Sequence, residues 1–279
     1  MTATSSSATN RVFATPEVLE IVLLQMDMRT LLTSAQRVCR GWMDLITKSP
    51  AIQKALFFTP IKESEWGNGA KTLNPLLADL FPSIFPAKTR ESPNPLTFSN
   101  LKMTQTPTNM FPFVRGDASW RKMLIQQPPI SEFGVLSLTH GRGGDSAATF
   151  SIPNDEKMQN AGYGGLRMER LFEFLLLSPE VQFLVYTRAR VYWSTEEPIM
   201  FGESHKEIND RFHQMMEKYD LVVYTREVLQ CSWHPRPPSA AEVTRREIIA
   251  AYQELGLETY SKVEGIEKAE GVVSTSRWA

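Results

Sequence analysis

Histidine and cysteine, the usual ligands of zinc, are few and widely spaced in this sequence. The chain has four histidines, His140, His205, His213 and His234. No two of them form an i, i+4 pair on a predicted helix, and none has a cysteine pair nearby. A zinc site needs about four such ligands converging on one point, usually at characteristic spacings. The sequence therefore predicts no metal site.

Candidate nucleophiles also lack the pattern that catalysis requires. The segments GDS at 144–146 and GES at 202–204 do not complete G-x-S-x-G, whose glycines permit the sharp turn that exposes a catalytic serine. The stretches GRGGD and GYGG lack the following Lys-Ser/Thr of a phosphate-binding loop, so we interpret them as turns. We expect no cofactor and no catalytic residue. A cleft that brought His140 and Asp145 within reach of Ser146 or Ser204 would instead favour a small enzyme of unknown type.

Composition narrows the class of protein. The 279 residues are 42% apolar and 22% charged, with a formal net charge of -1, which is typical of a globular protein and unfavourable for general nucleic-acid binding. Residues 1–58 carry six basic and four acidic side chains, too mild an excess for a DNA-binding helix-turn-helix. Two cysteines are too few for a disulfide framework, and Glu173 interrupts the longest apolar run. We expect a soluble intracellular protein with no membrane segment.

The distribution of proline, glycine and apolar residues predicts an α+β protein in which a module of three to four helices precedes a mixed α+β domain. We expect a disordered leader at 1–10, the helical module at 11–60 and a proline-rich linker or irregular segment at 61–117. The α+β domain should span 118–257 and a flexible tail 258–279.

Local patterns predict individual elements. In the module, helices should begin at Pro16 and at Pro50, each after a Ser/Thr cap, with two more over 31–38 and 40–47. In the domain, strands are expected at 133–138, 183–193 and 220–229, and loops around the two glycine-rich stretches. Helices are expected over 166–177 and through Ile208, Phe212 and Met215. A last helix should begin at Ser239 and carry Ile248, Ala251, Tyr252 and Leu255 on one face. The similar pentapeptides at 184–188 and 222–226 could lie in one sheet or be a coincidence.

The first helix is apolar on two sides. At about 100° per residue, one arc carries Val18, Leu19, Val22, Leu23 and Met26, and a second carries Ile21, Leu24 and Met28. A module of about 45 residues is close to the lower limit of independent stability. One arc is enough for its small core, so another surface should cover the second. Periodicity alone leaves open whether that surface belongs to the same chain or to a partner.

Residues 12–46 resemble the F-box, the helical motif that docks onto the Skp adaptor of cullin–RING ubiquitin ligases. The resemblance rests on Glu17-Val18-Leu19, on Leu31-Leu32 and on Val38-Cys39-Arg40 followed by Trp42. The sequence departs from the motif where Ala14-Thr15 replaces the usual Leu-Pro and where Met43 replaces a common basic residue. Segments 49–60 and 119–129 are similar to those of F-box proteins from filamentous fungi.

The resemblance implies a non-catalytic substrate receptor of the cytoplasm or nucleus, which binds the Skp adaptor and through it cullin, and recruits an unknown target for ubiquitination. It leaves open an F-box interaction protein that acts outside a ligase. Trp42 would be an anchor and Cys39 a small buried residue. The residues expected to form the adaptor contact, or to hold the helices that form it, are Pro16, Glu17, Leu19, Val22, Leu23, Met26, Leu31, Val38, Cys39 and Trp42.

Overall fold

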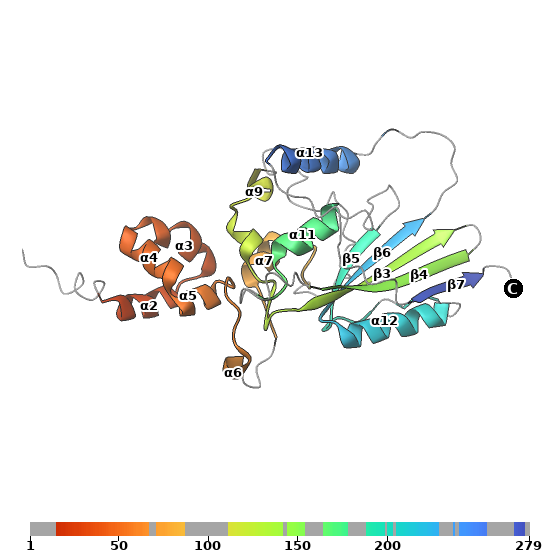
Figure 1. Cartoon of the computed structure of the whole chain (residues 1–279), viewed down its shortest axis with the longest axis horizontal. Helices are drawn as coiled ribbons and strands as arrows, with labels where there is room; N and C mark the ends of the chain where they lie inside the picture. Colours follow the sequence, from red (N-terminus) through yellow and green to blue (C-terminus); the bar gives the residue numbers. More distant parts are fainter. Residues whose placement is uncertain are drawn as a thin grey trace, which may run out of the picture.

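The chain forms a mixed α+β structure in which a group of short helices lies at one end of a domain built on a twisted sheet (Figure 1). The computed structural model describes residues 15–66, 71–86, 111–141, 144–153, 164–177, 188–198, 200–202, 205–228, 237, 240–255 and 271–276. The predicted leader and residues 183–187 of one predicted strand lie outside these ranges.

Three of the four α-helices within residues 15–60 begin with a recognisable signal, whereas the helix that begins at Arg40 has no side-chain cap. Proline occupies the first helical turn in two of them, and Ser49 Oγ accepts a hydrogen bond from the Ile52 amide at 3.1 Å. Asp27 caps another through the Thr30 amide at 2.9 Å. The elements are α2 (Pro16–Leu24), α3 (Met28–Thr33), the 3₁₀ turn η1 (Ala35–Arg37), α4 (Arg40–Lys48) and α5 (Pro50–Ala55). The predicted helices that begin at Pro16 and Pro50 and the one over 40–47 are confirmed. The helix predicted over 31–38 is wrong in its bounds, because α3 begins at Met28 and ends at Thr33, and residues 35–37 form a separate 3₁₀ turn.

The module has a small core of its own. Leu23, Ile46 and Ile52 are fully buried at its centre, and Trp42 and Leu45 pack against it from α4. The remaining buried apolar members are Leu19, Leu31, Ala35 and Leu56.

The domain is organised around a five-stranded sheet of order β5-β6-β3-β4-β7. Strands β3 and β4 form an antiparallel hairpin, β6 runs parallel to β3, and β5 and β7 add antiparallel strands at the two edges. The strands are β3 (Glu132–Gly141), β4 (Gly144–Pro153), β5 (Arg188–Trp193), β6 (Leu221–Val228) and β7 (Gly271–Ser276).

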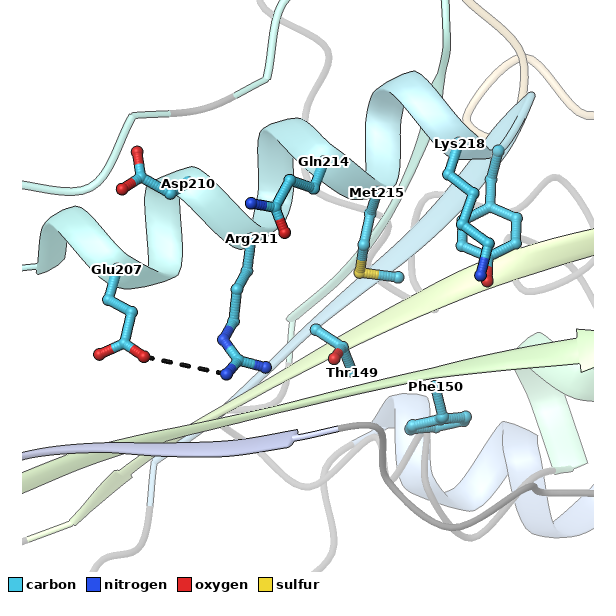
Figure 2. A pocket seen from close by; sticks show the side chains of 9 residues that line it. Thr149, Phe150, Glu207, Asp210, Arg211, Gln214, Met215 and Lys218 are labelled. Atoms are coloured by element: carbon cyan, nitrogen blue, oxygen red, sulfur yellow. Dashed lines mark ion pairs between the residues drawn. The ribbon is translucent and has the colours of Figure 1, made fainter.

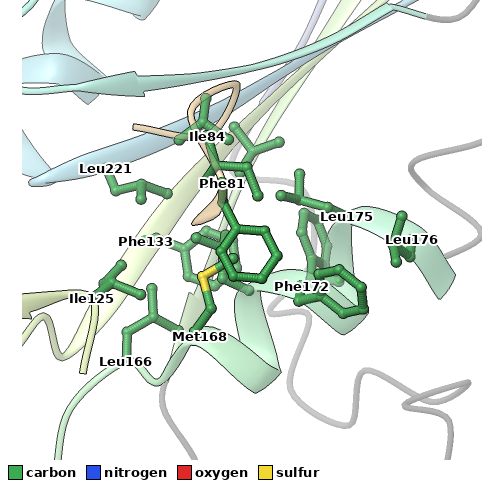
Figure 3. Packing of buried hydrophobic residues seen from close by; sticks show 14 of the residues in the cluster. Phe81, Ile84, Ile125, Phe133, Leu166, Met168, Phe172, Leu175, Leu176 and Leu221 are labelled. Carbon is green, nitrogen blue, oxygen red and sulfur yellow. The ribbon is translucent and has the colours of Figure 1, made fainter. Parts of the chain in front are cut away.

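Helices cover both faces of this sheet. On one face, α12 (Lys206–Lys218) packs Ile208 and Phe212 against alternate strand residues such as Leu136 and Tyr224. The opposite face packs against α11 (Met168–Leu177) (Figures 1 and 3). The inward residues predicted for α11 are all buried: Leu171, Phe172, Leu175 and Leu176.

The range predicted as a proline-rich linker is partly folded into the domain. Residues 71–86 contain the short strand β1 (Thr72–Leu73), which pairs with β2 (Gln126–Gln127), and the helix α7 (Pro75–Leu80). Asn74 caps α7, so Pro75 stands where its missing N–H is harmless. Phe81 behind α7 is then buried against Phe172 (Figure 3). Short helices α6 (Glu63–Trp66) and α9 (Phe111–Val114) also occur in this range, and a 3₁₀ turn, η4 (Ser119–Lys122), follows it.

Two further expectations are corrected in the sheet. The stretch GRGGDSAATF, expected as a loop, contributes most of β4, because its glycines lie at the hairpin end and Ala147 and Phe150 then point to opposite faces. Residues 271–276, within the expected flexible tail, form β7 by backbone pairing with β4. The predicted strands 133–138 and 220–229 are confirmed as β3 and β6. Of the two similar pentapeptides, the described residue Arg188 of the first lies opposite Arg226 of the second, so both lie in one sheet at this point.

The last helix, α13 (Ala240–Glu254), docks through a buried polar cluster. Arg121 donates to Glu173 at 2.6 Å and to the hydroxyl of Tyr252 at 2.6 Å, and it also pairs with Glu169. Ile248 and Tyr252 are buried as expected, whereas Leu255, which was expected on the same face, is 57% exposed because it follows the end of the helix. None of the helices in the described ranges is long and apolar enough to cross a bilayer.

The cluster predicts a pH dependence of stability. Burial raises the pKa of Glu173 from 4.5 to about 7, because Arg121 is shared between two carboxylates and cannot fully offset the cost of desolvation. At a pH between these two pKa values, Glu173 is protonated in the folded chain and ionised in the unfolded chain. The free energy of unfolding therefore falls as the pH rises through that range.

In urea unfolding, the free energy of unfolding of the parent should therefore be lower at pH 8 than at pH 5 by on the order of 1–3 kcal/mol. This difference should be lost in Glu173→Gln. Glu254→Gln, at the exposed end of α13, is the matched control and should keep the parent's pH dependence. Equal pH dependence in the parent and Glu173→Gln would contradict the assignment.

Candidate docking surface on the N-terminal helices

Helix α2 divides its apolar side chains between the core and solvent. Leu19 is 5% and Leu23 0% exposed, whereas Ile21 is 62% and Val18 37% exposed. Val22 lies between these extremes. The outward group of α2 is therefore Val18, Ile21 and Val22.

This division differs from the two arcs expected from periodicity. Leu24 and Met28, expected beside Ile21 on the outer side, pack against the module core, and Val18, expected on the inner arc, faces outward. The cause is the position of α4 and α5, which both contact α2 and enclose a wider sector of it than one narrow stripe. Ser49, which caps α5, also donates a hydrogen bond to Glu20 of α2.

A second exposed apolar group lies at the start of α4. Val38 is 59% and Met43 46% exposed. Cys39 is exposed as well, which corrects the expectation that it is a small buried residue. It occupies the N-cap of α4 in an extended conformation, outside the part of the helix that packs inward. We call Val18, Ile21, Val22, Val38 and Met43 together the outer apolar residues of the module.

The residues predicted for adaptor contact fall into three sets. Leu19, Leu23 and Leu31 are buried and hold the module together. Val22, Met26 and Trp42 are half-buried, and Met26 and Trp42 pack against the core. The exposed members are Pro16, Glu17, Val38 and Cys39. Ile21 and Met43, which were not among the predicted contacts, are among the most exposed large apolar side chains of the module.

A buried carboxylate elsewhere in the chain brings together two histidines. Asp145 of β4 lies 2.7 Å from Nδ1 of His140, its partner across the β3–β4 hairpin, and 2.7 Å from Nε2 of His205 at the start of α12. Asp145 is 2% exposed. Sequence spacing could not reveal this cluster, because 60 residues separate Asp145 from His205 and only the packing of α12 on the sheet joins them.

The cluster does not assemble the catalytic set considered from sequence. His140 and Asp145 do meet, but Ser146 follows Asp145 on a strand and so projects to the opposite face of the sheet. Ser204 and His234 lie outside the described residues. Within the described part of the chain, no group of three His, Cys, Asp or Glu side chains is arranged to hold a metal ion.

A cavity of about 480 Å³ lies between α12 and β4 (Figure 2). Its rim carries both signs of charge, and Arg211 lies 3.8 Å from Glu207 one helical turn away. Thr149 and Met215 line it from the sheet and the helix. This mixture of charges favours no single class of ligand.

Comparisons with protein-family models, curated proteins and solved structures give no match for this chain. The F-box resemblance of residues 12–46 therefore stays a prediction from the sequence. The main structural observation that bears on this prediction is the division of the apolar side chains of α2 between the core and solvent.

The division of α2 predicts that neighbouring apolar residues differ sharply in their effect on stability. Leu23→Ala should lower the free energy of unfolding by about 2–5 kcal/mol, because it opens a cavity in the module core. Ile21→Ala should change it by less than about 0.5 kcal/mol. Chemical denaturation of the two variants measures both values, and a large loss for Ile21→Ala would mean that Ile21 is covered.

Proposed function

We propose that this chain is an F-box-type substrate receptor, which binds a Skp adaptor through the outer apolar residues of its module and presents a target protein to a cullin–RING ubiquitin ligase. The observation that carries the proposal is the exposure of Ile21 and Val18 on a helix whose other side is sealed by Leu19 and Leu23. In this proposal the chain is not an enzyme and acts in the cytoplasm or nucleus.

The energetics of the outer apolar residues favour a protein partner. A large apolar side chain left in water forgoes about 1.5–3 kcal/mol relative to full burial. Ile21 on α2 and Val38 beside α4 are both more than half exposed although the module is only about 45 residues long. Removing such side chains from water is the main favourable term in protein association. The motif formed by these helices is the one that resembles the F-box.

The junction between the module and the domain supports the same role. Gln127, which is 3% exposed, donates to the Lys54 carbonyl at 2.9 Å and accepts from the Ile61 amide at 3.1 Å. The Leu124 amide donates to the Phe57 carbonyl at 2.8 Å. Phe57 has a φ of 61°, in the left-handed region that non-glycine residues rarely adopt. The hydrogen bond from Leu124 is made to the carbonyl of this residue.

A receptor accelerates ubiquitin transfer by holding its target near the conjugating enzyme, so a fixed relation between its two parts is useful. The hydrogen bonds of Gln127 and Leu124 fix that relation here. Catalysis in the proposed complex comes from the assembly, while this chain supplies position.

Co-purification with a Skp adaptor tests the proposal. Leu19 and Leu23 are unsuitable positions for it, because a charge there would unfold the module. The double variant Val18→Asp/Ile21→Asp should instead remain folded and lose adaptor binding by about a hundredfold or more. Met200→Asp, at a position in the domain that is 62% exposed, is the matched control and should bind like the parent.

Failure of the intact chain to bind the adaptor, or equal binding by the double variant, would overturn the proposal. Recovery of the adaptor without cullin would overturn the ligase role and favour an F-box protein that acts outside a ligase.

A further inference from the structure

A cavity of about 520 Å³ lies at the junction between the module and the domain. Small-molecule sites are typically 300–1,000 Å³ in volume and often lie between two structural units. Leu32 and Phe58 supply apolar surface to it, and Ser119, Lys122 and Arg167 line its domain side. All of the residues that line this cavity are within the described ranges.

The walls of the junction cavity are held by hydrogen bonds that do not depend on a ligand. Arg167 donates to the carbonyl oxygens of Phe58, at 3.3 Å, and of Lys122, and so joins the module to the domain. On the module side, the side-chain amide of Gln53 donates to the Ile46 carbonyl at 2.8 Å. A ligand would therefore enter a shape that is already formed, which lowers the entropic cost of binding.

The charges around the cavity favour an anion. Its two carboxylates already have arginine partners, since Asp117 accepts from Arg115 at 2.7 Å and Glu169 pairs with Arg121. Lys122 is exposed, and Arg167 adds a second cation to the lining. With Glu173, which shares Arg121 with Glu169, the charged groups here are four cations and three carboxylates, so the net charge around the cavity is positive: Arg115, Arg121, Lys122 and Arg167 against Asp117, Glu169 and Glu173.

We propose that the junction cavity binds a small amphipathic anion, whose aromatic or branched apolar body lies against Leu32 and Phe58 and whose carboxylate or sulfonate faces Lys122. Such a ligand contacts the module and the domain at once, so its binding stabilises their junction. The proposal is independent of adaptor binding and can be tested on the isolated chain.

Ligand-observed NMR and isothermal titration of the intact chain with 2-naphthalenesulfonate test the proposal. The parent should bind the probe with one-to-one stoichiometry, and Lys122→Glu should weaken binding about tenfold or more. Ser119→Trp, which places an indole in the cavity from an exposed position, should abolish binding. Lys206→Glu, an exposed lysine on α12, is the matched charge-reversal control and should bind within about twofold of the parent.

Circular dichroism should show that all three variants fold, because the substituted side chains are exposed. Absence of binding to the parent at millimolar probe overturns the proposal. Equal affinity in the parent and Lys122→Glu also overturns it, because the probe then binds without the proposed cation.

Discussion

Helix α2 carries more apolar side chains than its module can enclose. Leu19 and Leu23 are sealed in a core of only a few residues, and this core holds the short helices together. Ile21 is left in water on the other side of the same helix. A nine-residue helix cannot turn both sides inward against so small a module, so Ile21 stays exposed, and in our proposal a second protein covers it.

The module is joined to the domain by buried polar contacts as well as by the chain. Gln127 belongs to a short strand of the domain yet bonds to Lys54 and Ile61, and Arg167 from the segment before α11 reaches Phe58. Buried amides lose their partners if such a junction opens, which costs about 1–3 kcal/mol for each unsatisfied group. Because opening the junction is costly, the module and its outer apolar residues keep a fixed position relative to the sheet.

Local sequence signals were sufficient for the elements that carry them. Proline after a capping residue located α2 and α5, and apolar periodicity located α11. Proline density misled for 71–86, because Pro75 begins a helix, and glycine density misled for β4, because its glycines mark only the hairpin end. The meeting of Asp145 with His205 depends on long-range packing, and the exposure of Cys39 depends on how neighbouring helices pack, so neither could be obtained from periodicity.

Hydrogen–deuterium exchange of the intact chain, with and without a purified Skp adaptor, tests most directly whether the outer side of α2 is an interface. The account predicts slower exchange in α2 and in residues 38–43 when the adaptor is present, with exchange in β3 and β6 unchanged. Unchanged exchange in α2, or protection confined to the sheet, would contradict it.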